Sequence, residues 1–67
     1  MGKYIARINE KYTAHSFEAD GTFDLKIFEE EKEVYYHNLL LYSLQDASKV
    51  IRRRLNIRGK RIKWESK

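Results

Sequence analysis

Apolar and polar residues alternate along much of the first 27 residues with a period of two, which is typical of β-strands. One such segment runs from Lys3 to Asn9. A second runs from Tyr12 to Ala19, with Phe17 as its main apolar residue. A third runs from Phe23 to Ile27 and alternates without interruption. The pattern therefore predicts three consecutive strands.

Two short polar segments predict the turns that follow these strands. Asp20-Gly21 separates the second and third segments, and such a pair is a hairpin signal because a type I′ turn needs positive φ at both residues. Glu29 to Glu33 is too acidic for a sheet interior and predicts the next turn, before a strand that opens at Val34 to Tyr36. His37 to Tyr42 fits either the end of that strand or a buried connection.

The period changes to that of an α-helix at Ser43. Ser43 and Asp46 form a Ser-x-x-acid pair, in which the hydroxyl caps a backbone N–H and the acid suits the positive helix end. Asn56 and Gly59 are stop signals for the same helix. Between these ends the apolar residues recur at steps of three and four, as one helical face: Leu44, Ala47, Ile51 and Leu55.

A last alternating segment, Lys60 to Trp64, predicts a closing strand. The chain has no proline, no Gly/Ser-rich linker and no internal repeat, so residues 1–67 are predicted to form a single small domain. The predicted fold is α+β, with a small antiparallel sheet of three to five strands and one helix packed on it. The element order is β-β-β(-β)-α-β.

Composition limits how this domain gains stability. At 67 residues a core supplies only about 3–5 kcal/mol, so small domains often add disulfides, a metal or a partner subunit. The chain has no cysteine, which removes disulfides and thiolate metal sites and leaves a homodimer as the common remaining solution. Its 42% hydrophobic and 13% aromatic content excludes a disordered basic peptide.

The same composition argues against a membrane protein. The longest apolar run is Leu39 to Leu41, far shorter than the roughly 20 residues that cross a bilayer. Lys3 follows Met1 and Gly2 with no apolar stretch before it, so a signal peptide is not expected. A cytoplasmic protein without membrane contact is the expectation.

Charge is distributed very unevenly along the chain. Residues 51–67 hold eight basic residues and one acid, which gives +7, whereas the first fifty residues hold six basic and nine acidic residues, which gives −3. A concentrated basic end is the usual electrostatic footprint for a polyanion. Apolar residues at helix and strand spacing run through this end, so the charge is expected on folded structure.

The basic end supplies the predicted nucleic-acid contacts. Arginine suits phosphate because its planar fork donates two hydrogen bonds at once. The expected phosphate contacts are Lys49, Arg52, Arg53, Arg58, Lys60, Arg61 and Lys63. Little sequence readout is expected, because nothing identifies readers of base edges. Whether the partner is DNA, RNA or an acidic protein stays open at this stage.

Three aromatic residues, Trp64, Tyr35 and Tyr36, have ring faces on which unpaired bases stack. The competing interpretation is that Trp64 anchors the last strand to the core. The competing interpretation of the two tyrosines is that they are ordinary half-buried sheet residues.

Nothing in the sequence indicates an enzyme. His15 and His37 do not form a metal-binding pattern, and there is no cysteine nucleophile, Gly-rich phosphate loop or serine elbow. No catalytic residue, metal or cofactor is therefore assigned. A small metal-independent nuclease is the remaining enzymatic alternative, since general acid–base catalysis needs only well-placed groups.

The alternative function is a protein–protein interaction module. The acidic turn at Glu29 to Glu33, the tyrosines and a sheet edge would form its contacts. Such a module would be a small dimeric adaptor or inhibitor, of the kind that phages and other mobile elements encode.

Overall fold

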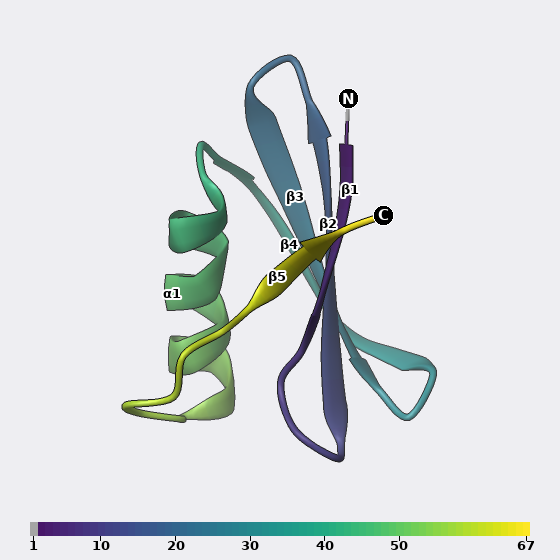
Figure 1. Ribbon diagram of the computed structural model, residues 1–67, viewed down its shortest axis with the longest axis vertical. Coiled ribbons are helices and arrows are strands. Elements are labelled where there is room, and N and C mark those ends of the chain that lie inside the picture. Colours follow the sequence, from purple (N-terminus) through teal and green to yellow (C-terminus); the bar gives the residue numbers. More distant parts are fainter. Residues whose placement is uncertain (1) are drawn as a thin grey trace.

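The computed structural model describes residues 2–67 as one five-stranded antiparallel sheet and one helix (Figure 1). Along the chain these are β1 (Gly2–Arg7), β2 (Tyr12–Ala19), β3 (Thr22–Glu29), β4 (Lys32–Leu41), α1 (Leu44–Leu55) and β5 (Trp64–Ser66). In the sheet the order is β4-β3-β2-β1-β5. The predicted α+β fold and its element order are confirmed.

Two-residue turns join β2 to β3 and β3 to β4. Asp20 and Gly21 have φ values of 54° and 79°, as a type I′ turn requires. The predicted hairpin is therefore confirmed. Glu30 and Glu31 form the second turn with φ values of 49° and 75°, a conformation that residues with a Cβ adopt only at a cost.

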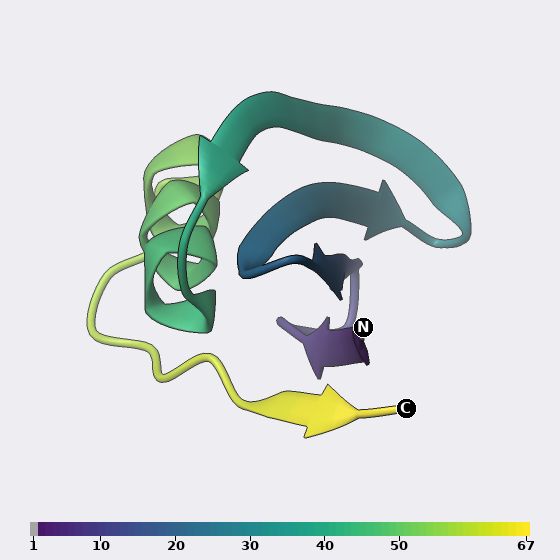
Figure 2. The same cartoon turned by 90° about the horizontal axis from the view of Figure 1, so that it is seen from above.

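The helix covers one face of the sheet and leaves the other face uncovered (Figure 2). Where α1 lies over the sheet, the strands present the small residues Ala6 and Ala14, which are directly opposite each other on β1 and β2. Small side chains let the helix approach closely, so its apolar stripe reaches Leu25 and Ile27 on β3. The buried core consists of Ala6, Ile8, Ala14, Leu25, Ile27, Leu41, Ala47, Ile51 and Ile62.

Strand β2 differs from expectation in which residues it buries. Its buried side chains are those of Ala14 and Ser16, whereas Phe17 is 39% exposed on the opposite face. Successive strand residues point to opposite faces, and the helix packs on the face that carries the small residues. The largest apolar residue of this strand therefore lies outside the core.

Strand β4 continues through Leu41, so the ambiguous segment is strand from His37 to Leu41, and Tyr42 follows the strand. Leu25 lies opposite His37 but Phe23 lies opposite Leu41, which leaves three β4 residues facing the single residue between them on β3. This irregularity turns two of the three leucines outward. Leu39 and Leu40 are 67% and 64% exposed, and Leu41 is buried.

Both ends of α1 follow the predicted signals. The Asp46 N–H donates to the Ser43 Oγ at 3.1 Å, and the Asp46 Oδ2 accepts from the Tyr42 N–H at 3.3 Å. At the other end Asn56 takes the left-handed conformation, with φ 55°, and its N–H bonds the Arg52 carbonyl. A short polar side chain tolerates this conformation better than most.

The closing strand begins later than predicted. Residues 60–63 are not in a strand, and β5 pairs with β1 only from Trp64, opposite Ala6, to Ser66, opposite Tyr4. The reason is that the chain must first return from the end of α1 to the β1 edge (Figure 1). Ile62 is buried on the way, so its apolar character anchors this connection to the core.

Candidate nucleic-acid interface

Basic side chains from α1 and the following connection surround two adjoining hollows. The first, of about 510 Å³, is lined by Lys49, Arg52, Arg53 and Arg58, and the second, of about 360 Å³, by Lys49, Arg52 and Arg61. We call these five residues the C-terminal basic surface. Lys49 and Arg52 border both hollows, so the five positive charges form one continuous group.

No acidic side chain in the part of the chain that the structure describes pairs with the charges of this surface. Within residues 2–67 none of the five side chains forms an ion pair, and the pair recorded there is Lys11 with Glu29, at 3.8 Å. Lys49, Arg53, Arg58 and Arg61 are exposed and Arg52 is half-buried. Apart from the Arg52 Nε, which bonds the Lys60 carbonyl, their hydrogen-bond donors therefore remain available to an anion.

Arg52 also fixes the shape of the surface. Its Nε donates a hydrogen bond of 3.2 Å to the carbonyl oxygen of Lys60, which holds the connection after α1 against the helix. The side chains of Lys60 and Lys63 are exposed but line neither hollow. The structure thus brings together five of the seven predicted contacts and leaves Lys60 and Lys63 outside this group.

Arg54 belongs to a different surface although it is adjacent to Arg53. Its guanidinium carbon lies 4.4 Å from the centroid of the Tyr35 ring, a distance typical of a cation–π contact. The Tyr35 Oη is in turn 2.8 Å from the His37 Nδ1. Tyr35 was a candidate for stacking a base and for contacting a protein partner. Its side chain already contacts Arg54 and His37.

The other two aromatic residues lie on opposite sides of the sheet. Trp64 is half-buried and its indole Nε1 donates to the Ser48 Oγ at 2.9 Å, which is the anchoring role weighed against stacking. Tyr36 is 49% exposed, with the Lys26 Nζ 5.9 Å from its ring centroid. It lies on the face that α1 leaves uncovered.

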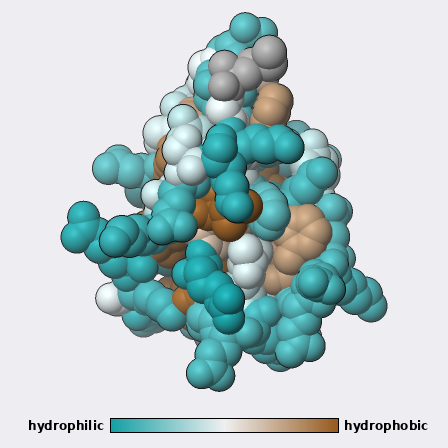
Figure 3. Space-filling view, turned by 45° about the vertical axis from the view of Figure 1, so that its right-hand side comes forward, coloured by the Kyte–Doolittle hydropathy of each residue, from teal (hydrophilic) through white to brown (hydrophobic). Residues whose placement is uncertain are grey.

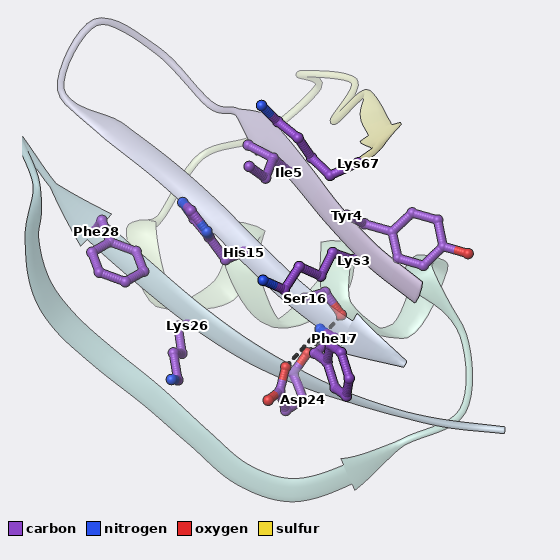
Figure 4. Close-up of a pocket in the computed structure, with 10 residues that line it drawn as sticks. All are labelled: Lys3, Tyr4, Ile5, His15, Ser16, Phe17, Asp24, Lys26, Phe28 and Lys67. Atoms are coloured by element: carbon purple, nitrogen blue, oxygen red, sulfur yellow. Dashed lines mark hydrogen bonds between the residues drawn. The ribbon is translucent and has the colours of Figure 1, made fainter. Parts of the chain in front are cut away.

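This uncovered face is a second candidate surface, which the sequence analysis did not single out. Ile5, His15, Lys26 and Tyr36 lie opposite one another in turn across β1 to β4, and paired residues share one face of a sheet. We call it the open sheet face. Its hollow, of about 490 Å³, is shown in Figure 4 with α1 behind the sheet, and Lys3, His15, Phe17, Lys26, Phe28 and Lys67 are among its lining residues.

Apolar and basic groups alternate on the open sheet face. Figure 3, which turns this side forward, shows apolar surface set among long hydrophilic side chains. The rings of His15 and Phe28 have centroids 4.7 Å apart and are tilted by 54°, so they do not lie face to face. Burial lowers the pKa of His15, and the positive charges of the three neighbouring lysines lower it further.

The acid lining this hollow, Asp24, is engaged by the backbone. Its Oδ1 accepts from the Phe17 N–H at 2.7 Å, and its carbonyl accepts from the Ser16 Oγ at 2.7 Å. These bonds replace the regular pairing between β2 and β3 at this point. Asp24 therefore supports the sheet next to Phe17 while the lysines around it stay without an acidic partner in residues 2–67.

A repeated sequence signal marks the open sheet face. Three neighbouring strands each place a basic or imidazole residue two positions before a large apolar one: Lys3-x-Ile5, His15-x-Phe17 and Lys26-x-Phe28. A separation of two keeps both residues on one face of a strand. The signal was visible in the sequence, but its meaning depends on which face the helix covers.

Two further features bear on chemistry and location. In the part of the chain that the structure describes, no group of histidine, aspartate and glutamate side chains is placed to hold a metal ion. Among the same residues, the helix is too short and too polar to cross a membrane.

Comparison of the chain with protein-family models, with curated proteins and with solved structures found no match. The fold and the two surfaces therefore define this protein as a small α+β domain with a sheet covered on one face only.

Proposed function

We propose that this protein binds nucleic acid and contacts the phosphates through the C-terminal basic surface, with little sequence readout. The observation that carries the proposal is the gathering of five cationic side chains around two adjoining hollows, without an acidic partner in residues 2–67. Like charges held together repel one another, and an anion with several regularly spaced charges relieves that repulsion. The proposed location is the cytoplasm, in keeping with a chain that contains no cysteine.

The physical form of this binding is mainly electrostatic. Each phosphate that is neutralised releases counterions, so five contacts on duplex DNA give a slope of about −4.5 for log affinity against log salt concentration. Fluorescence anisotropy with labelled duplex and single-stranded DNA and RNA measures this slope directly. Absence of binding to every probe at low salt would overturn the proposal.

Adjacent arginines provide a matched pair of variants. Arg53 lines the first hollow, whereas Arg54 lies over the Tyr35 ring. Arg53→Gln and Arg54→Gln remove the same charge from neighbouring positions. We expect Arg53→Gln to weaken binding to all nucleic acids and to reduce the salt slope by about 1, while Arg54→Gln has a much smaller effect. Equal losses would show that only net charge matters.

A triple variant tests the surface as a whole. Lys49→Gln, Arg53→Gln and Arg61→Gln together remove three of the five charges and leave Arg52, whose bond to the Lys60 carbonyl holds the connection in place. We expect this variant to stay folded, as measured by circular dichroism, and to lose most of its affinity. Unchanged affinity in a folded triple variant would place the binding site elsewhere.

A second candidate function rests on the edge of the sheet. Strand β4 has a neighbour on one side only, and Leu39, Leu40 and Tyr42 at its end are 67%, 64% and 67% exposed. Exposed apolar residues beside an unpaired strand edge suit a protein partner or a second copy. A pull-down from nuclease-treated lysate tests this function. Wild type should retain a protein in stoichiometric amount, and Leu40→Asp should not retain it.

A further inference from the structure

The open sheet face combines two chemical features that a packing surface does not need. Its aromatic residues, Phe17, Phe28 and Tyr36, are on three different strands. Lys3, Lys26 and Lys67 lie among or beside them, and all three line the same hollow as both phenylalanines (Figure 4). Rings alone would suit any apolar partner, whereas rings flanked by lysines suit a ligand with flat apolar groups joined by negative charges.

We propose that the open sheet face binds the unpaired bases of a single-stranded nucleic acid, which stack on Phe17 and Phe28 while the lysines hold the adjoining phosphates. This inference rests on the proposed function and specifies its ligand as single-stranded. Every base has a π-face, so stacking of this kind tolerates any sequence. It agrees with the limited sequence readout proposed for the basic surface.

The positions of the two phenylalanines along the sheet fit a strand with its bases unstacked. On β2 His15 lies two residues from Phe17, a step of about 7 Å along one face. Phe28 lies opposite Thr13, one further step along. The two phenylalanines are therefore separated by about 14 Å along the strand direction, with His15 between them. Two bases with one nucleotide between them can therefore rest on the two phenylalanine rings, across the hollow of about 490 Å³.

Duplex nucleic acid does not offer this contact. In a duplex the bases are stacked on one another and present only their edges, whereas unpaired bases can be splayed onto aromatic side chains. A duplex can still meet the C-terminal basic surface through its phosphates. The two surfaces therefore predict different preferences, and this difference separates one proposal from the other.

Charge argues against a second copy of the chain on the open sheet face. A two-fold symmetric dimer pairs a surface with itself, so Lys3, Lys26 and Lys67 would approach the same lysines of the other copy. Like charges that face each other across an interface are strongly unfavourable. The acids on this face, Asp24 and Glu65, are outnumbered by the three lysines, and the Asp24 Oδ1 is already bonded to the Phe17 N–H.

One strand of nucleic acid can reach both surfaces around the β5 edge. β5 is the outermost strand on its side of the sheet (Figure 2). Arg61, before β5, lines a hollow beside α1, and Lys67, after β5, lines the hollow on the open sheet face. The Lys67 N–H donates to the Lys3 carbonyl at 2.8 Å, which fixes the end of the chain beside that hollow.

The test compares four probes of equal length: oligothymidine, oligouridine, an abasic DNA strand and a DNA duplex. The abasic strand keeps the phosphates and lacks the bases. We expect the two strands with bases to bind at least tenfold more tightly than the abasic strand. Equal affinity for abasic and complete strands would overturn the inference. The difference between oligothymidine and oligouridine shows whether DNA or RNA is preferred.

Three leucine variants locate the stacking surface. Phe17→Leu and Phe28→Leu remove a ring from the open sheet face and keep an apolar side chain, and we expect each to lose about tenfold in affinity for oligothymidine and little for duplex. Phe23→Leu is the matched control. Phe23 is on β3 like Phe28 but packs against the core, with its ring 6.1 Å from that of Tyr4. Phe23→Leu should lower the stability of the protein without a selective loss of affinity for oligothymidine.

The outcomes distinguish the two proposals. If Arg53→Gln weakens all probes while both phenylalanine variants bind like wild type, the proposed function stands and the inference about the open sheet face is wrong. If no probe binds, both fail. If wild type is a dimer in sedimentation and Phe28→Leu is a monomer, the open sheet face is an interface between copies and the inference is again wrong.

A measurement on the wild-type protein avoids any effect of substitution on folding. Oligothymidine that carries photoreactive 5-bromouracil is bound and irradiated, and the crosslinked residues are identified by mass spectrometry. We expect crosslinks in the two segments that carry Phe17 and Phe28. Crosslinks confined to residues of the C-terminal basic surface would overturn the stacking inference.

Discussion

The indole Nε1 of Trp64 donates a hydrogen bond of 2.9 Å to the Ser48 Oγ and thereby joins β5 to α1. The same hydroxyl donates to the Leu44 carbonyl at 2.9 Å. A serine hydroxyl has one proton to donate and lone pairs to accept, so Ser48 serves both partners at once. Because β5 is only three residues long, this contact is a large part of what holds the end of the chain in place.

Removing the acceptor should therefore destabilise the domain. We expect Ser48→Ala to lower the free energy of unfolding by about 1–3 kcal/mol, because the partly buried indole N–H loses its partner. For a domain of this size each kcal/mol corresponds to a Tm decrease of about 4–8 °C. Thermal unfolding followed by circular dichroism measures the change. In a Trp64→Phe background, where no indole remains, Ser48→Ala should lower the free energy of unfolding clearly less than it does in wild type.

The contact of Arg54 with the Tyr35 ring gives a second expectation. Arg54→Gln should lower the free energy of unfolding by about 0.5–1 kcal/mol, because the ring loses its cation. Arg53→Gln, with the same change of charge, should have less effect on stability. Urea unfolding of both variants in a Tyr35→Leu background completes a double-mutant cycle. A coupling energy near zero would show that the contact contributes nothing.

The Glu30-Glu31 turn should be open to improvement. Both residues have positive φ, which costs a residue with a Cβ about 1–2 kcal/mol. Asn-Gly is a preferred pair for this turn, so Glu30→Asn with Glu31→Gly should raise the free energy of unfolding by about 1 kcal/mol. Urea unfolding measures it, and Glu33→Gln controls for the loss of acidic charge. If the control is equally stabilised, charge repulsion and not backbone conformation is the cause.

Gly21 provides the reverse test of the same principle. Its φ is +79° and nothing lies within 4 Å of the position that a Cβ would occupy. Gly21→Ala should therefore destabilise the β2–β3 hairpin through backbone conformation alone, by about 1 kcal/mol. The midpoint of urea unfolding measures this loss. An unchanged midpoint would mean that the turn relaxes to another conformation.

The pKa of His15 makes folding stability depend on pH. Burial is the main cause that lowers this pKa below its usual value of 6.5, and Lys26, Lys67 and Lys3 contribute further. The unfolded chain therefore binds the proton more readily than the folded protein, and stability falls as the pH drops below about 6.5. Asp24 and Glu65 are the acids on the same face of the sheet. Urea midpoints above and below this pH should differ less in His15→Gln than in wild type.

Local structure was largely predictable from the sequence. The Asp20-Gly21 pair, the Ser43–Asp46 cap and the stop at Asn56 depend on neighbouring residues only, and all three are found where the pattern indicated. The start of β5 was predicted four residues too early. Alternation between Lys60 and Trp64 indicates an extended chain, but a strand also requires a partner, and pairing with β1 begins only at Trp64.

The candidate surfaces also depend partly on local sequence and partly on tertiary structure. Helical spacing alone puts Lys49, Arg52 and Arg53 on the side of α1 away from its apolar stripe. Their meeting with Arg58 and Arg61 depends on the path of the connection after α1, which the bond from Arg52 to the Lys60 carbonyl fixes. The exposure of Lys60 and Lys63 outside the two hollows depends on that path too.

The sequence by itself determined the elements, their turns and the concentration of positive charge at one end, because these follow from spacing and from the conformations of single residues. Only the tertiary structure decided which face of the sheet is covered. A period of two separates Ala14 and Ser16 from His15 and Phe17 but does not say which pair is buried. The helix packs on the small residues because they allow close approach, and this leaves Phe17, Phe28 and the lysines beside them facing solvent.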